Sequence, residues 1–225
     1  LEHVRYRGFD GVVIACVDFE DPEVAQLVAS DIPVVTIDHI FNNRIAVMSD
    51  NVKGMQSLLR YIYSCGHRRI AYIHGHPSSV TGSRLSSFYK TAEELGLKVP
   101  DEYVLEAGYR DTDGAAAATQ QLLALPCPPT CILYPDDFAC LGGMNMLREK
   151  GLRIPEGISI AGYDGLRIGR HMDPKLTTLK QDTQKLGGYA AEKLISLIEH
   201  PKTSVPEILV VEGEVYEGRS VGNIG

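Results

Sequence analysis

The chain has 225 residues, 44% of them hydrophobic and 23% charged, which is an ordinary balance for a globular protein with a buried core. Its 22 Lys and Arg residues stand against 29 Asp and Glu residues, a net charge of −7. No basic run exceeds the pair Arg68 and Arg69, so we do not expect this chain to bind DNA by itself. No apolar run approaches the roughly 20 residues of a membrane span, and no signal-peptide pattern opens the chain, so neither a membrane protein nor a secreted one is indicated.

Short apolar runs rich in Val and Ile alternate with segments of helical periodicity. The runs are continuously hydrophobic, which is typical of strands buried on both faces of a parallel sheet. In chain order the pattern predicts strands at residues 11–16, 33–37 and 45–48, a helix over 52–62, a strand at 70–73, a helix over 85–95, a strand at 130–134, a helix over 141–147, a strand at 158–163 and a helix over 186–198.

The ends of these helices carry ordinary start and stop signals. Asp50 is a candidate N-cap for the first, Gly66, Gly96 and Gly151 follow the first three, and Pro201 stops the last. Alternating strands and helices form right-handed βαβ units, so we predict an α/β fold with doubly wound parallel sheets. Neither an internal repeat nor a linker-like shift in composition divides the chain.

Carboxylates follow several of the predicted strands. Asp38, Asp50, the pair Asp136 and Asp137, and Asp164 each come just after an apolar run. Ligands of open α/β sheets bind beyond the carboxyl ends of the strands, so together these residues favour a polar cleft. For any one of them taken alone, a turn at a strand end or a helix N-cap is the favoured interpretation.

Arg84 stands near the start of its predicted helix and offers a planar fork of donors for a diol or a neighbouring carboxylate. A cluster of carboxylates repels phosphates and other anions but accepts hydrogen bonds from hydroxyl groups. A neutral sugar or polyol is therefore the expected ligand of Asp38, Arg84, Asp136 and Asp164. The alternative for Arg84 is a structural or surface ion pair.

The sequence supports no enzyme, metal or cofactor site. Ser87 to Lys90 and Ser49 to Asn51 match two penicillin-recognising motifs, but in reverse order and without the third. His74 and His76 alternate along a strand, which points them apart, and no further ligand stands at metal-binding spacing. Phosphate-cradling loops are missing, so we expect no catalytic residue, no metal and no cofactor.

The cysteines favour a reducing compartment. They are an odd number, none forms a Cys-x-x-Cys pair, and most lie in apolar runs, so free thiols in the cytoplasm are expected instead of a disulfide framework. The five are Cys16, Cys65, Cys127, Cys131 and Cys140.

Several short strings, in order from Phe9 to Ser220, resemble those of LacI/GalR-type transcriptional regulators. They are Phe9–Ile14 (family pattern DGII), Pro33–Asp38 (PVVxID), Asp50–Gly54 (DNxxG), Gly66–Gly75 (GHRRIxxxxG), Arg84–Phe88 (RxxGF), Gly151–Asp164 (GxxVPxDISVVGFDD) and Pro174–Gln181 (PxLTTVxQ). The resemblance implies that Asp38, Arg84 and Asp164 line a cleft for a sugar or a nucleobase.

The chain departs from the family pattern at four positions. Asp136 replaces Asn, Ser87 replaces Gly, Gly165 replaces the second Asp of its motif, and Gly218 replaces Arg. These changes are compatible with the fold but leave the effector open.

The resemblance also implies a division into two lobes joined by a hinge of three chain crossovers. Residues 1–49 and 183–212 would form the N-terminal lobe, and 50–182 with 213–225 the C-terminal lobe. Residues 1–6 read like a helix end running into a strand, so we expect a fragment whose N-terminal lobe lacks its first strands. A helix-turn-helix headpiece and a hinge helix would precede it.

The function implied is the effector-binding domain of a cytoplasmic bacterial repressor that binds operator DNA as a homodimer. Closure of the lobes around a small-molecule effector would control DNA binding by the headpiece. A periplasmic solute-binding protein of a sugar transport system has the same fold and is the alternative, and an α/β enzyme is the third. The cysteines and the motifs favour the regulator. The upstream coding sequence would decide between the first two: a helix-turn-helix there indicates the regulator, and a signal peptide indicates the solute-binding protein.

Overall fold

A computed structural model describes residues 8–15, 21–201 and 205–225, so Cys16 and the opening segment fall outside the described residues. The internal contacts divide the chain into two compact units. Unit 1 comprises Leu1–Asp50 and Asp182–Glu212, and unit 2 comprises Asn51–Gln181 and Gly213–Gly225. Each unit is a doubly wound α/β layer structure, as predicted.

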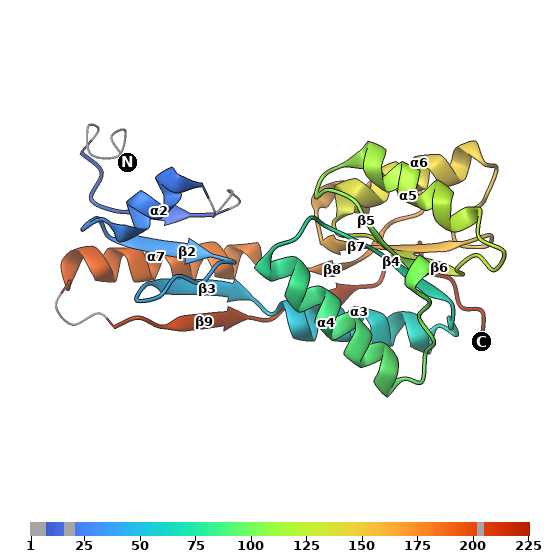
Figure 1. The fold of residues 1–225 in the computed structure, drawn as a ribbon, viewed down its shortest axis with the longest axis horizontal. Helices are drawn as coiled ribbons and strands as arrows, with labels where there is room; N and C mark the ends of the chain where they lie inside the picture. Colours follow the sequence, from blue (N-terminus) through green and yellow to red (C-terminus); the bar gives the residue numbers. More distant parts are fainter. Residues whose placement is uncertain (1–7, 16–20, 202–204) are drawn as a thin grey trace. The chain divides into compact units, whose positions relative to one another are not determined.

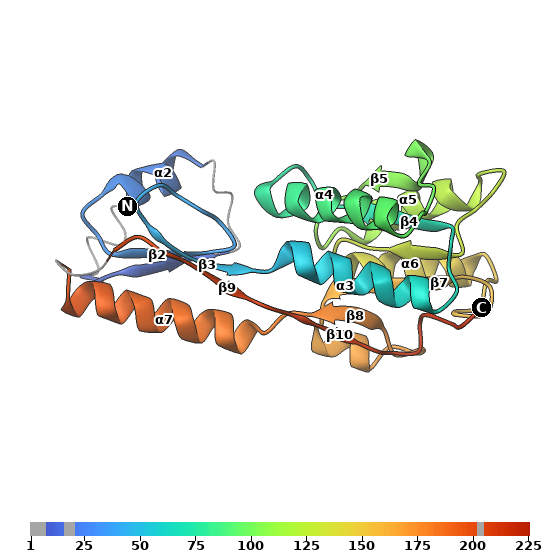
Figure 2. The ribbon, with the colours of Figure 1, turned by 90° about the horizontal axis from the view of Figure 1, so that it is seen from below.

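Unit 1 is built on a parallel sheet of four described strands in the order β1-β2-β3-β9. Helix α2 (Pro22–Ala29) lies on one face of this sheet and α7 (Thr183–Glu199) on the other (Figure 1), and the same two layers are visible in Figure 2. The strands are β1 (Val12–Ile14), β2 (Val34–Ile37), β3 (Ile45–Ser49) and β9 (Ile208–Val211).

Each face of the unit 1 sheet has its own small core. Leu186 and Ala190 of α7 pack on Val35 and Val47. On the other face Leu27 of α2 packs with Ile14 and Val34, among other residues. Because both faces are covered, the strand residues read as continuous apolar runs.

Unit 2 is built on a six-stranded sheet in the order β10-β8-β7-β6-β4-β5, parallel except for β10, which runs antiparallel to β8. Its strands are β4 (Ile70–His74), β5 (Val104–Glu106), β6 (Cys131–Leu133), β7 (Ser159–Asp164), β8 (Thr177–Lys180) and β10 (Glu214–Tyr216). Its helices are α3 (Asn51–Ser64), α4 (Ser79–Glu94), α5 (Thr112–Leu123) and α6 (Asp137–Glu149), with short 3-10 turns η1 (Asp101–Tyr103) and η2 (Arg167–Arg170).

Two hydrophobic layers sandwich the unit 2 sheet. Helices α5 and α6 cover one face and α3 and α4 the other (Figure 1). The first layer includes Leu122, Met144 and Ile160, and the second includes Leu58 and Phe88. The described part of the chain contains no helix that is long and apolar enough to cross a bilayer.

All six predicted strands and all four predicted helices are present. Periodicity did not single out α2, α5 or the strands β5, β8, β9 and β10, which are three or four residues long. Strands β5, β9 and β10 have exposed or half-buried positions, and β8 carries polar residues, so none of them reads as a continuous apolar run like those of the predicted strands.

The Gly-His-Arg-Arg motif, residues 66–69, connects several elements at the start of β4. His67 is buried, with its ring nitrogens 2.9 Å from the Thr130 hydroxyl and 3.1 Å from the Gly222 carbonyl. Burial lowers the pKa of His67 below its ordinary value. The guanidinium of Arg68 stacks over the Tyr63 ring at 3.7 Å, and Arg69 donates to the Pro128 carbonyl. The motif therefore joins α3, β4 and the C-terminal segment.

Helix α3 approaches the sheet closely at one residue. A Cβ atom at Gly54 would collide with the hydroxyl of Tyr163 and with a methyl group of Leu179. On α7, by contrast, Gly187 is exposed and a Cβ atom there would meet nothing.

We predict opposite effects for one substitution at these two sites. Gly54→Ala should lower the free energy of unfolding by about 1–3 kcal/mol, because the methyl group overpacks the helix–sheet interface. Gly187→Ala should raise it by roughly 0.5–1 kcal/mol, because alanine has the better helix propensity. Chemical denaturation of both variants and the wild type measures the difference. Equal shifts of the same sign would contradict the close approach.

Candidate functional site

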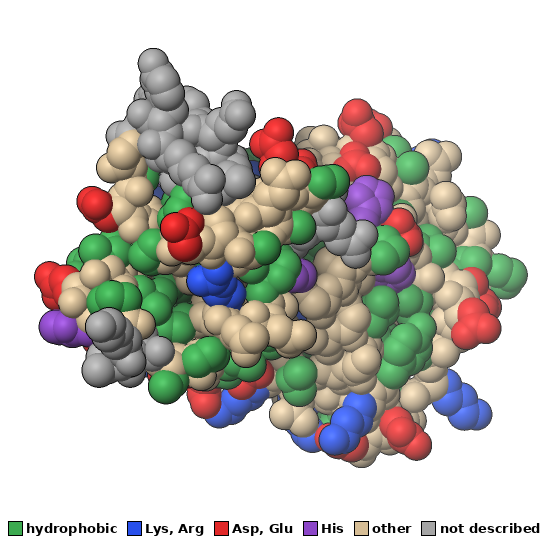
Figure 3. Space-filling model, turned by 60° about the vertical axis from the view of Figure 1, so that its left-hand side comes forward, with side chains coloured by type: hydrophobic (Ala, Val, Ile, Leu, Met, Phe, Trp, Pro, Cys, Tyr) green, Lys and Arg blue, Asp and Glu red, His purple; other side chains and the backbone are tan. Residues whose placement is uncertain are grey.

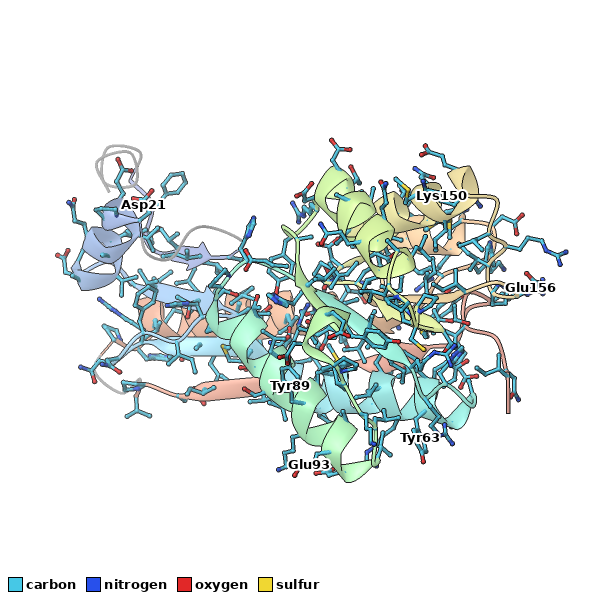
Figure 4. The ribbon with its side chains drawn as sticks, turned by 45° about the vertical axis from the view of Figure 1, so that its right-hand side comes forward. Asp21, Tyr63, Tyr89, Glu93, Lys150 and Glu156 are labelled. Atoms are coloured by element: carbon cyan, nitrogen blue, oxygen red, sulfur yellow. The ribbon has the colours of Figure 1, made fainter. Side chains whose placement is uncertain are left out.

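Arg84 is carried on the inner face of α4. Ser78 is the N-cap of this helix, and its hydroxyl accepts a hydrogen bond from the Thr81 amide at 3.1 Å. Arg84 is only 4% exposed, whereas Tyr89 and Glu93, labelled in Figure 4, lie on the outer face. A charged group held this deeply must be solvated by the protein.

Three oxygen-bearing groups surround the guanidinium. Its Nε donates to Asn51 Oδ1 at 2.8 Å, and Nη1 donates to the Pro135 carbonyl at 3.0 Å. Its Nη2 lies 3.9 Å from Asp164 Oδ1. A guanidinium has five N–H groups, so the two hydrogen bonds to described residues leave donors for a ligand.

Aromatic rings lie above and beside the same guanidinium. The centroid of the Tyr163 ring is 3.6 Å from its carbon, and that of Tyr109 is 6.0 Å away. Burial alone would lower the pKa of Arg84, but the oxygens of Tyr163, Tyr109 and Asp164 outweigh it and hold that pKa above its ordinary value. Arg84 is therefore a permanent cation.

Tyr72 adds a buried phenol to this surrounding. Among the described residues its hydroxyl has no hydrogen-bond partner, and burial raises its pKa, with Arg84 acting in the opposite direction. Tyr109 is exposed, and its hydroxyl lies 2.8 Å from that of Thr81. The site thus combines a buried cation, aromatic faces and hydroxyl groups.

Asp164 ends β7 in a left-handed conformation, with φ of 98°. Its Oδ1 accepts a hydrogen bond from Gln181 Nε2 at 2.6 Å, and its side chain is 32% exposed. The structure therefore brings Arg84 and Asp164 together at the carboxyl edge of the unit 2 sheet, where strand-end reasoning expects a ligand.

Asp136 is the N-cap of α6. Its Oδ1 accepts from the Ala139 amide at 2.8 Å and its Oδ2 from the Arg110 amide at 2.6 Å, and the residue is 2% exposed. The Ala139 bond is the one that the N-cap interpretation expects, and the Arg110 amide, outside the helix, engages the second oxygen. A contact of Asp136 with an effector stays a prediction.

Asp137 is a buried carboxyl group that the sequence did not distinguish from its neighbour. It has no exposed surface, and it accepts hydrogen bonds from the Thr178 hydroxyl and the Leu166 amide. Burial raises the pKa of Asp137 to about 7. The two hydrogen bonds act to lower this pKa, and the charges of Asp164 and Asp136 act to raise it further. In the sequence, the only signal that could have pointed to Asp137 was its place after Asp136 at a strand end.

Asp38 belongs to unit 1, where it follows β2 with φ of 58°. Its Oδ1 accepts from the Ser49 amide at 2.6 Å, and its Oδ2 lies 3.2 Å from the Ser49 hydroxyl. Asp38 therefore joins the ends of β2 and β3, and its contact with an effector also stays a prediction.

The side chains weighed as enzyme or metal motifs have ordinary partners. His74 Nδ1 lies 2.8 Å from the Gly75 carbonyl, and His76 Nδ1 lies 2.9 Å from Glu106 Oε1. Ser87 donates to the Val52 carbonyl at 2.7 Å. Within the described ranges no group of three or more His, Cys, Asp or Glu side chains is arranged to hold a metal. The described cysteines, Cys65, Cys127, Cys131 and Cys140, are free thiols.

Surface charge is dispersed on the face drawn in Figure 3. Blue Lys and Arg side chains stand apart from one another among red carboxylates and green hydrophobic groups. The view agrees with the net charge of −7 and shows no basic patch of the kind that follows a DNA backbone.

Comparison with known proteins places this architecture among bacterial regulators. A family model described as the periplasmic binding protein-like domain matches residues 59–221. The HTH-type transcriptional repressor PurR of Escherichia coli is 32% identical over 230 residues, covering 99% of this chain and 66% of PurR. The probable repressor ExuR of Bacillus subtilis is 29% identical over 212 residues, covering 92% of this chain and 63% of ExuR.

Solved structures share the fold. The regulator CelR in complex with cellobiose matches 97% of this chain and 68% of its own, with a TM-score of 0.88 and 24% identity. A LacI family regulator from Enterococcus faecium with bound ribose matches 100% and 84%, with a TM-score of 0.88 and 24% identity. A LacI family regulator from Mycobacterium smegmatis is 26% identical, with a TM-score of 0.87 over 99% of this chain and 82% of its own.

This chain spans less than two thirds of the length of PurR and ExuR. The family model covers most of it, and the relatives named are transcriptional repressors instead of transport proteins. The chain therefore belongs to the periplasmic binding protein-like domain family, as an effector-binding domain of the LacI/GalR type.

Proposed function

We propose that this domain binds a neutral sugar or a related polyol and thereby controls operator binding by a helix-turn-helix headpiece of the whole protein. The observation that carries the proposal is the pair Arg84 and Asp164, a buried cation and a half-buried carboxylate 3.9 Å apart at the carboxyl edge of the sheet. One supplies planar donors and the other an acceptor, which is the set that a vicinal diol requires.

The surroundings of this pair favour a neutral ligand. Arg84 already faces Asp164, and Asp136 and Asp137 are close enough for the charges of Asp164 and Asp136 to act on Asp137, so carboxylates outnumber cations around the pair. A phosphate or sugar acid would be repelled, whereas hydroxyl groups gain acceptors and a CH face can pack on a tyrosine ring. The descriptions of CelR with cellobiose and of the Enterococcus regulator with ribose support this ligand class.

Signalling follows if the effector also binds Asp38. Asp38 is in unit 1 and Arg84 and Asp164 are in unit 2, so an effector that contacts all three favours the arrangement in which both units reach it. A headpiece whose orientation depends on that arrangement would then be coupled to the effector. We further propose a cytoplasmic homodimer without catalytic activity, because palindromic operators match a two-fold symmetric protein.

We predict that both members of the pair contribute directly to effector affinity. Arg84→Lys keeps the charge but loses the planar fork, and Asp164→Asn removes the charge at nearly constant volume. A charged hydrogen bond is worth roughly 1.5–3 kcal/mol, so each variant should weaken binding by about 10- to 100-fold. Calorimetry of the full-length protein with a panel of neutral sugars, including ribose and cellobiose, measures this.

The matched control is Arg60→Gln, which breaks an exposed ion pair with Glu94 elsewhere on unit 2 and should leave affinity unchanged. Sugar phosphates should fail to bind the wild type. Unchanged affinity in both site variants would place the effector elsewhere.

Operator binding should respond to the effector. The full-length protein should be a dimer by ultracentrifugation and should bind its operator in a salt-dependent manner. Saturating effector should change operator affinity by about 5- to 150-fold, the range of typical coupling energies, and Asp38→Asn should reduce that change. Equal operator affinities with and without bound effector would show that the domain binds without signalling, and the regulatory proposal would be wrong.

A further inference from the structure

The backbone that follows Asp164 is unusual. Asp164 and Gly165 both have positive φ, 98° and 70°, so the chain turns sharply where β7 ends. A left-handed non-glycine residue persists only where its surroundings hold it. The orientation of the Asp164 carboxylate toward Arg84 therefore depends on what fixes residues 165 and 166.

Asp137 and Thr178 provide that support. Asp137 Oδ2 accepts the Leu166 amide at 2.6 Å, and its Oδ1 accepts the Thr178 hydroxyl at 2.7 Å. The same Thr178 oxygen lies 3.3 Å from the Gly165 amide, which donates to it. One buried carboxyl group thus holds two consecutive amides, one directly and one through Thr178.

Close packing keeps Asp137 in this place. Gly162 of β7 pairs with Thr178 of β8, and a Cβ atom at Gly162 would collide with Asp137 Oδ1. The carboxyl group therefore rests directly on the strand, at a position that only glycine leaves open.

We propose that Asp137, acting with Thr178, is a positioning residue that holds the turn after β7 and so presents the Asp164 carboxylate to the effector. It contacts neither the effector nor Arg84, and its influence on binding rests on the proposed function. The two adjacent carboxyl groups then have different roles: Asp136 caps α6, and Asp137 fixes the turn after β7.

The charge state of Asp137 gives this role a pH signature. Burial raises its pKa to about 7, and the ionisable groups that face it are Asp164 on β7 and Asp136 and Cys140 on its own segment. The carboxylate accepts both hydrogen bonds well, whereas the neutral acid accepts only weakly through its hydroxyl oxygen. The turn should therefore be held more firmly above pH 7 than below it.

Two neighbouring threonines on β8 provide a matched test. Thr178→Val removes the link to Asp137, while Thr177→Val removes an equally buried hydroxyl that instead accepts the Gly218 amide at 3.2 Å. In the full-length protein, Thr178→Val should speed hydrogen exchange of the Gly165 and Leu166 amides by about tenfold or more. Thr177→Val should speed hydrogen exchange of the Gly218 amide and leave exchange of the Gly165 and Leu166 amides unchanged.

Affinity for the ribose and cellobiose probes should fall by about 5- to 30-fold in Thr178→Val and change less than about twofold in Thr177→Val. Unchanged exchange at Leu166 would overturn the proposed support, and unchanged probe affinity despite faster exchange would overturn its positioning role. If the wild type binds neither probe, the ligand class of the proposed function fails, while exchange at Leu166 still decides whether the turn is held.

The pH dependence of wild type and Asp137→Asn separates positioning from simple stability. A carboxyl group with a raised folded-state pKa stabilises the fold at low pH, and this contribution is lost as the pH rises through about 7. Probe affinity should move the other way and rise by about three- to tenfold between pH 6 and 8. Asp137→Asn should lack both steps. Affinity and stability that rise or fall together would contradict the positioning role.

Discussion

The buried guanidinium of Arg84 is the constraint on which the rest of unit 2 depends. A cation that is 4% exposed requires an amide oxygen, a carbonyl oxygen, a carboxylate and an aromatic face within reach, and these come from Asn51, Pro135, Asp164 and Tyr163. The four residues lie on α3, the end of β6, and β7. Fixing one side chain thus fixes the ends of several elements relative to one another, so the site is formed before any ligand enters.

Continuous apolar runs predicted the strands because helices cover both faces of each sheet. The same rule missed β8, where Thr177 and Thr178 are buried although they are polar, since their hydroxyls are engaged by the Gly218 amide and by Asp137. The Ala-rich helix α5 was missed because its packing against α6 relies on close approach instead of bulky residues, as at Gly142, where a Cβ atom would collide with Thr112.

Strand-end reasoning placed Asp164 at the carboxyl edge of the sheet, because parallel strands deliver their last residues to one edge. Arg84 lies on α4 and was singled out by its place near a helix start and by the family pattern. Strand-end reasoning was insufficient for the pair Asp136 and Asp137. Two adjacent carboxylates after a strand look alike in a sequence, and only the start of α6 decides which one caps the helix and which one turns inward to Thr178. Neighbouring side chains at a helix start point in different directions, and the residue types alone do not show which direction each side chain takes.

The chain leaves and re-enters each unit, and this imposes an order on its assembly during synthesis. Strand β10 and the residues that bond to β7, β8 and His67 come after residue 212, so unit 2 lacks an edge strand until the second part of unit 1 has left the ribosome. Unit 1 in turn waits for α7 and β9. Neither unit can therefore mature as an independent N-terminal domain, and a nascent chain stalled before residue 213 exposes the open side of β8 to any unpaired strand nearby.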